Sequence, residues 1–151
     1  MKILFICHGN ICRSPMAEFV LRKMAEEQGI DLETASAATS TEEIGNPVHP
    51  GTKRILQRLG IDCSGKRAVQ FRPGDYEKYD YLIAMDSANV RNILRIAGGD
   101  RDGKVKKLLE FAGSCNDVAD PWYTGDFEAT YRDVKAGCEG ILKAMNVVPT
   151  L

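Results

Sequence analysis

The chain has 151 residues, of which 44% are hydrophobic and 27% charged, and its formal net charge is −1 at pH 7. This length predicts one domain, residues 1–151, with a sizeable core, and the near-neutral charge excludes a broad basic surface for nucleic acid. The first apolar run starts at Ile3 without a leader pattern, no apolar stretch is long enough to span a membrane, and the five cysteines are irregularly spaced, so we expect a cytoplasmic protein with free thiols and no membrane insertion.

Strand and helix signals alternate from the start of the chain. Lys2–Cys7 is a short continuous apolar run, typical of a buried parallel strand. Ser14 and Pro15 then predict a helix start, with Ser14 as the N-cap, and Gly29 predicts its end. A second short strand is predicted over Glu33–Ala37.

The later elements continue the same alternation. They are a helix over 52–59 closed by Gly60, a strand over 81–85, a helix over 90–97, a weaker strand over 105–111 and a long helix over 127–145. Alternating strands and helices predict an α/β fold with a parallel sheet covered by helices on both faces. Ligands of such folds bind at the carboxyl ends of the strands.

The stretch CHGNICRS, Cys7 to Ser14, falls at that end of the first predicted strand. A loop that enters a helix offers free N–H groups and the positive end of the helix dipole, which together bind anions. Gly9 permits a tight turn, Asn10 tolerates a left-handed conformation, and the planar guanidinium of Arg13 matches two phosphoryl oxygens. The positive electrostatic potential of these groups favours the thiolate form of Cys7. The stretch therefore predicts a nucleophile that attacks phosphorus.

Each of these residues also has an ordinary interpretation. A cysteine at the end of a buried strand is most often a small hydrophobic side chain, and the spacing of Cys7 and Arg13 alone is weak evidence. Cys7 and Cys12 lack a second pair of cysteines with metal-ligand spacing, so no metal site is expected. The glycine pattern of a dinucleotide-binding fold is absent as well. The combination of strand, cysteine, Gly-Asn, arginine and helix start is what favours phosphate chemistry.

The segment from Cys7 to Pro15 resembles the phosphate-binding loop of the low-molecular-weight protein tyrosine phosphatases. Further likenesses follow in the family's order and at about its spacing: SAAT at 36–39, IGNP at 44–47, the strand over 81–85 with Asp86, and DPWY at 120–123. The resemblance implies a three-layer fold with a four-stranded parallel sheet, no metal or other cofactor, and a phosphocysteine intermediate. It also implies that tyrosine-phosphorylated proteins are the substrates.

Within this resemblance, the general acid maps to Asp120. An Asp-Pro pair before aromatic residues is most often just a turn, and Asp117 is a nearby competitor that lacks the Pro-aromatic pair. The chemistry nevertheless requires a proton for the leaving oxygen, which neither Cys7 nor Arg13 can supply. We therefore expect catalysis by Cys7, Arg13 and Asp120. Phosphate binding is expected from the whole loop, which adds His8, Gly9, Asn10, Ile11 and Cys12.

Supporting and substrate-contacting residues follow from the same comparison. Ser14 is expected to hydrogen-bond the Cys7 thiolate, and Asn10 and Ser36 to brace the loop. Walls of a slot for a flat aryl group are expected from Ile11, Trp122 and Tyr123, with Glu42 at the rim. The resemblance further implies that Cys12 can form a protective disulfide with Cys7, with simple packing as its alternative. The remaining cysteines, Cys63, Cys115 and Cys138, are expected to be structural, and His8 and His49 to be non-catalytic.

Three departures from the family pattern bear on substrate choice. Ala38 stands where glycine is usual, Glu42 stands where an aromatic or apolar residue is common, and the stretch from Ser64 to Phe71 lacks a histidine that often follows this serine.

Three other functions stay open. A protein-arginine phosphatase has a similar loop with Thr at the place of Ile11, an arsenate reductase needs a further cysteine pair that residues 85–97 lack, and a binding-only phosphoprotein module would not need Cys7, Arg13 and Asp120 together.

Overall fold

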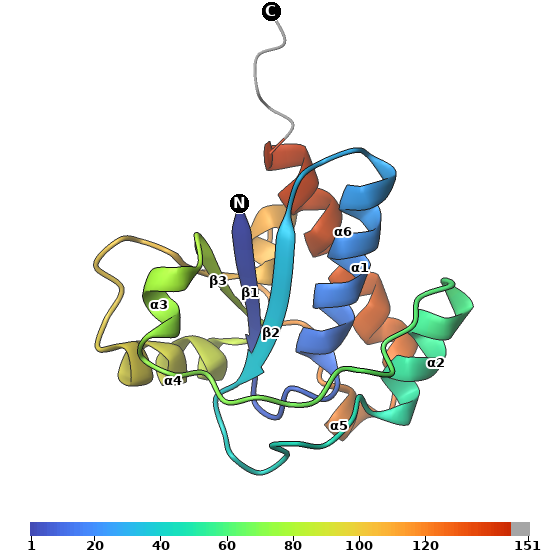
Figure 1. The fold of residues 1–151 in the computed structure, drawn as a ribbon, viewed down its shortest axis with the longest axis horizontal. Helices are drawn as coiled ribbons and strands as arrows, with labels where there is room; N and C mark the ends of the chain where they lie inside the picture. Colours follow the sequence, from blue (N-terminus) through green and yellow to red (C-terminus); the bar gives the residue numbers. More distant parts are fainter. Residues whose placement is uncertain (146–151) are drawn as a thin grey trace, which may run out of the picture.

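The computed structural model describes residues 1–145. Its four strands form one parallel sheet in the order β2-β1-β3-β4 (Figure 1). The strands are β1 (Lys2–Cys7), β2 (Glu33–Ala38), β3 (Tyr81–Ala84) and β4 (Val105–Lys107). The predicted three-layer α/β architecture with a four-stranded parallel sheet is confirmed.

The helices cover both faces of this sheet (Figure 1). In chain order they are α1 (Arg13–Glu27), α2 (Pro50–Arg58), α3 (Asp75–Lys78), α4 (Ser87–Ala97), the 3-10 helix η1 (Leu108–Ala112), α5 (Pro121–Thr124) and α6 (Phe127–Met145). Side chains alternate along β1, so Ile3, Phe5 and Cys7 pack in the core with α1 and α6, and Leu4 and Ile6 pack in the other core with α4. No helix within residues 1–145 combines the length and apolarity needed to cross a membrane.

The segment over 105–111 is the clearest departure from the predicted elements. The strand ends at Lys107, and Leu108–Ala112 turns into a 3-10 helix that buries Leu108 and Leu109. Two glycines of α6 permit this turn to lie against the helix, because a Cβ on Gly137 would overlap Leu108 and one on Gly140 would overlap Phe111. The burial of apolar side chains against α6 therefore decides where β4 ends.

The carboxyl ends of β1, β2 and β3 meet at one edge of the sheet, the lower end in Figure 1. Two loops add to this edge. Residues 39–49 run below it, and residues 61–74 cross from α2 to α3, where Gln70 forms a bridge with Ala38 at the end of β2. The segment that the sequence comparison marks as unusual, Ser64 to Phe71, thus reaches the end of β2, where Val69 and Phe71 hydrogen-bond to the backbone of Ala38.

Candidate active site

Cys7 is the last residue of β1, and the loop that follows it curls around its sulfur atom. The backbone N–H of Asn10 donates to Cys7 Sγ at 3.3 Å, and the Ser14 hydroxyl oxygen lies 3.0 Å from the same sulfur. Asn10 has a φ of 60°, the left-handed conformation expected for it. Gly9 has no Cβ, and a Cβ built there would lie 3.3 Å from Cγ of Glu43, so its small size lets the next loop approach.

Asn10 holds the loop from inside. Its Nδ2 donates to the Ser14 hydroxyl at 2.8 Å, and its Oδ1 accepts from the backbone N–H of Val69 at 3.1 Å. Asn10 is 1% exposed, so both bonds are shielded from water. The segment from Ser64 to Phe71 therefore supports the loop through a backbone group, which any residue type at position 69 except proline could supply.

Two expectations for the loop are wrong. Helix α1 begins at Arg13 with Cys12 in the N-cap position, not Ser14, because the Ser14 hydroxyl is engaged by Cys7 and Asn10. Ser36 does not brace the loop directly either. Its hydroxyl donates to Glu18 Oε1 at 2.6 Å, so this side chain joins β2 to α1 instead.

Arg13 is 3% exposed and lies between two carboxylates. Its Nη1 donates to Asp86 Oδ2 at 2.9 Å and to the Val118 carbonyl at 3.2 Å, and its Nη2 donates to Asp120 Oδ2 at 3.3 Å. Burial alone would lower the pKa of Arg13, but the charges of Cys7, Asp120 and Asp86 raise it above its ordinary value. The guanidinium is therefore a permanent, oriented positive charge beside Cys7.

Asp120 occupies the N-cap position of α5, a one-turn helix at the place where an Asp-Pro pair most often marks a turn. Its Oδ1 accepts from the N–H of Trp122 at 3.1 Å, which leaves Oδ2 directed at Arg13. The competitor Asp117 accepts instead from Lys107 Nζ at 2.9 Å and from Ser87. The hydrogen bond from Lys107 lowers the pKa of Asp117, so this residue is unsuited to donate a proton.

A pocket of about 400 Å³ opens above Cys7. Every residue from Cys7 to Arg13 lines it, as do Glu42, Asp120, Trp122 and Tyr123, so the structure brings together the predicted catalytic and slot residues. Trp122 is 65% and Tyr123 85% exposed, which leaves both rings free to contact a ligand at the rim. Glu42 Oε2 lies 2.9 Å from Nε2 of His8 across the mouth of the pocket.

Several lining residues were not singled out from the sequence as site residues: Glu43, Asp86, Ala88, Asn89 and Asn92. Asp86 had a signal, because it follows the third predicted strand and so lies at the same sheet edge as Cys7. Its side chain accepts from the N–H of Asn89 at 2.7 Å, which makes it the N-cap of α4 as well as a partner of Arg13.

Cys12 lines the pocket but is largely buried, with 7% of its surface exposed. Burial, with the charges of Cys7 and Asp120, raises the pKa of the Cys12 thiol to about 12. Cys63 and Cys138 are buried and Cys115 is exposed, and none of the three lines the pocket. Among residues 1–145, no group of histidine, cysteine and carboxylate side chains could hold a metal ion.

Comparison with known proteins places this site in context. Residues 2–148 match the family model described as "Low molecular weight phosphotyrosine protein phosphatase". The low molecular weight protein-tyrosine-phosphatase PtpA of Staphylococcus epidermidis is 42% identical over 144 residues, covering 94% of this chain and 92% of its own. YfkJ of Bacillus subtilis, of the same description, is 40% identical over 149 residues and 96% of each chain.

Solved structures agree with the sequence relatives. The crystal structure of YfkJ matches with a TM-score of 0.92, over 97% of this chain and 94% of that one. The low molecular weight protein tyrosine phosphatase SP-PTP of Streptococcus pyogenes matches at 41% identity with a TM-score of 0.85, over 95% and 92% of the two chains. The loop around Cys7, the sheet that carries it and these matches together establish that the chain belongs to the low-molecular-weight phosphotyrosine protein phosphatase family.

Proposed function

We propose that Cys7, Arg13 and Asp120 carry out the family's hydrolysis of protein phosphotyrosine in two phosphoryl transfers. The observation that supports this assignment is their convergence on one pocket: Cys7 Sγ accepts from the N–H of Asn10, and Arg13 is hydrogen-bonded to Asp120. Asp86 and the Val118 carbonyl both accept from Nη1 of Arg13 and so fix that guanidinium nitrogen. They therefore act as positioning groups for Arg13.

In the first transfer, the Cys7 thiolate attacks phosphorus, an S–P bond forms, and the bond from phosphorus to the phenolic oxygen breaks. Arg13 and the loop N–H groups stabilise the charge on the equatorial oxygens. Asp120 gives its proton to the phenolic oxygen, and tyrosine leaves. A phosphoryl dianion in the loop repels a second negative charge nearby, which favours the protonated carboxyl that this step needs.

In the second transfer, water attacks the phosphorus of phosphocysteine. Asp120, now a carboxylate, accepts the proton of that water, the S–P bond breaks, and inorganic phosphate leaves Cys7 as the thiolate. The cycle returns every group to its starting protonation state. No step in it calls for a metal ion or an external cofactor.

The walls of the pocket favour phosphotyrosine as the substrate. A tyrosine ring holds phosphorus farther from the peptide backbone than serine does, and Trp122, Tyr123 and Ile11 offer apolar surface along that distance. Ile11 has no hydroxyl to orient a guanidinium, which disfavours phosphoarginine. Residues 85–97, which follow β3 and include α4, contain no cysteine, and this disfavours arsenate reduction. We further propose a cytoplasmic location, with tyrosine-phosphorylated proteins as partners.

Initial rates on matched phosphotyrosine, phosphoserine and phosphoarginine substrates, with a metal chelator present, test this proposal. We expect kcat/KM to be highest on phosphotyrosine and unchanged by the chelator. The Ile11→Thr variant should shift the ratio toward phosphoarginine. A wild-type preference for phosphoarginine would show that the pocket walls do not select the substrate, and loss of activity in chelator would contradict the metal-independent cycle.

Peroxide should inactivate the enzyme reversibly through a Cys7–Cys12 disulfide. Oxidation needs a thiolate first, and the raised pKa of Cys12 leaves Cys7 as the thiol that reacts with peroxide, after which Cys12 displaces hydroxide from the sulfenic acid. Mass spectrometry should detect this crosslink, and a thiol reductant should restore activity. In Cys12→Ser, recovery should fall as oxidation proceeds to sulfinic acid. Equal recovery in both proteins would leave Cys12 with a packing role alone.

A further inference from the structure

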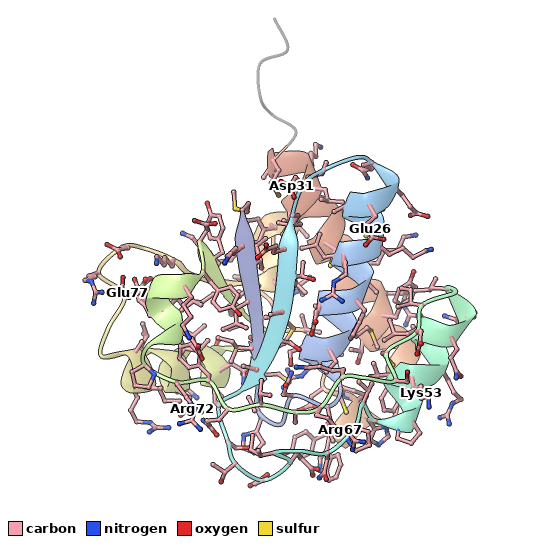
Figure 2. The ribbon with its side chains drawn as sticks, in the orientation of Figure 1. Glu26, Asp31, Lys53, Arg67, Arg72 and Glu77 are labelled. Atoms are coloured by element: carbon pink, nitrogen blue, oxygen red, sulfur yellow. The ribbon has the colours of Figure 1, made fainter. Side chains whose placement is uncertain are left out.

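A largely buried cation lies in the segment that crosses the end of β2, outside the lining of the pocket. The side chain of Lys66 is only 12% exposed, and its Nζ donates to the Ser36 carbonyl at 3.0 Å. Figure 2 shows this segment, marked by its neighbour Arg67, passing in front of the lower part of β2. Lysine is rarely buried without a partner that balances its charge, so negatively charged groups are expected near Lys66.

The carboxylate nearest to Lys66 is already engaged. Glu18 Oε1 lies 4.0 Å from Lys66 Nζ and accepts from the Ser36 hydroxyl at 2.6 Å, while Glu18 Oε2 accepts from Arg22 at 2.6 Å. One buried carboxylate therefore faces two cations. This cluster of Glu18, Arg22 and Lys66 carries a net charge of +1.

The charge of Cys7 is the second negative charge that acts on Lys66. Ser36, whose carbonyl binds Lys66, pairs with Phe5 two residues before Cys7, and β2 ends where Ala38 pairs with Cys7. Burial lowers the pKa of Lys66, and the charges of Glu18 and Cys7 oppose that change. Because the interaction between two charges is mutual, an ammonium that is favoured by the thiolate favours the thiolate in turn.

We propose that Lys66 is a positioning residue whose largely buried positive charge, outside the lining of the pocket, favours the thiolate form of Cys7. The inference rests on the proposed role of Cys7 as nucleophile. The pocket side of Cys7 already has Arg13, with Asp86 and Asp120 as its counter-charges, and the loop supplies Ser14 and the Asn10 N–H. Lys66 adds a cation outside the lining of the pocket, and because its side chain is only 12% exposed, solvent screens this charge less than it screens a surface lysine.

The test is a titration of Cys7 by alkylation with iodoacetamide, a neutral reagent, between pH 3.5 and 8. The background is Cys115→Ser, which removes the exposed thiol, and mass spectrometry of the modified peptide reports the rate without any assay of turnover. We expect Lys66→Met to raise the midpoint of this titration by about half to one pH unit, equivalent to a roughly 3- to 10-fold slower alkylation below the midpoint.

Three further variants separate charge from packing. Lys66→Gln keeps a donor for the Ser36 carbonyl but no charge, so it should shift the midpoint as Lys66→Met does, while Lys66→Arg should restore it. Glu18→Gln leaves the two cations without their carboxylate, and its midpoint should move in the opposite direction. The control is Lys53→Met, a lysine on the exposed side of α2 (labelled in Figure 2), which should leave the midpoint unchanged.

The direction of the midpoint shifts supports or overturns the proposed role of Lys66. Opposite shifts for the Lys66 and Glu18 variants, with rescue by arginine, support the proposal. An unchanged midpoint in Lys66→Gln, or shifts of the same sign in Lys66→Met and Glu18→Gln, would overturn it, because then the side chain acts only as a tie between segments. If phosphotyrosine turnover were absent while these shifts appeared, the proposed function would fail and the electrostatic inference would stand.

Discussion

The Cys7→Ser variant is expected to lose phosphotyrosine turnover by about 10⁴-fold or more, because a neutral hydroxyl is a far weaker nucleophile at neutral pH than a thiolate. The loop should keep its shape, since Asn10 is held independently by Ser14 and by the N–H of Val69. A phosphotyrosine peptide should therefore still bind. Rates at saturating substrate measure the loss of turnover. Peptide binding is measured by the fluorescence of Trp122, which is the one tryptophan of the chain and lines the pocket.

The matched control for this substitution is Cys115→Ser, which changes an exposed cysteine outside the pocket and should keep the rate of the wild type. If Cys7→Ser retained even a tenth of the turnover, the nucleophile would lie elsewhere. Loss of peptide binding together with turnover would instead indicate that the loop had collapsed, and the rate would then say nothing about nucleophilic attack.

The second large effect is expected from Asp120→Asn, which should slow hydrolysis of aryl phosphates by roughly 10²- to 10⁴-fold if Asp120 supplies general acid catalysis. Asparagine is as good an N-cap as aspartate, so the start of α5 and the position of Trp122 should persist. The loss should shrink as the leaving phenol becomes more acidic, because such a leaving group needs less protonation. A series of substituted phenyl phosphates measures this dependence.

Asp117→Asn is the control, since this neighbouring carboxylate binds Lys107 and does not line the pocket. It should change the rates little, and equally for all leaving groups. An equal loss across the series in Asp120→Asn would assign that residue to the support of α5 and Arg13. A loss that grows with the pKa of the leaving phenol assigns it to proton transfer.

Much of this site could be predicted because most of its residues fall in two short contiguous stretches of the chain. Cys7 to Ser14 encode strand end, turn, guanidinium and helix in a single stretch, and Asp120 is followed directly by the Pro-Trp-Tyr of its own helix. Local sequence is sufficient where the groups that cooperate are neighbours in the chain. The strand order follows less directly, but the alternation of strands and helices restricts it to a few parallel arrangements.

The parts that sequence reasoning missed depend on contacts between distant segments. Val69 supports Asn10 through a backbone N–H, a group that every residue but proline has, so no side chain marks it. Ser36 was predicted to brace the loop, but its hydroxyl donates to Glu18 of α1 instead. The sequence alone does not mark Glu18 as a buried residue. Lys66 in isolation looks like a surface lysine, and its burial follows only from the path of residues 61–74 across the sheet edge.

The left-handed conformation of Asn10 has a consequence for the thermodynamics of anion binding. A non-glycine residue at φ 60° costs about 1–2 kcal/mol relative to ordinary backbone, and its bonds to Ser14 and Val69 oppose that cost in the folded chain. The loop therefore loses its conformational entropy when the protein folds and little more when phosphate arrives. Anion affinity is in this way coupled to the local stability of residues 61–74, and agents that loosen that segment weaken phosphate binding without touching the loop.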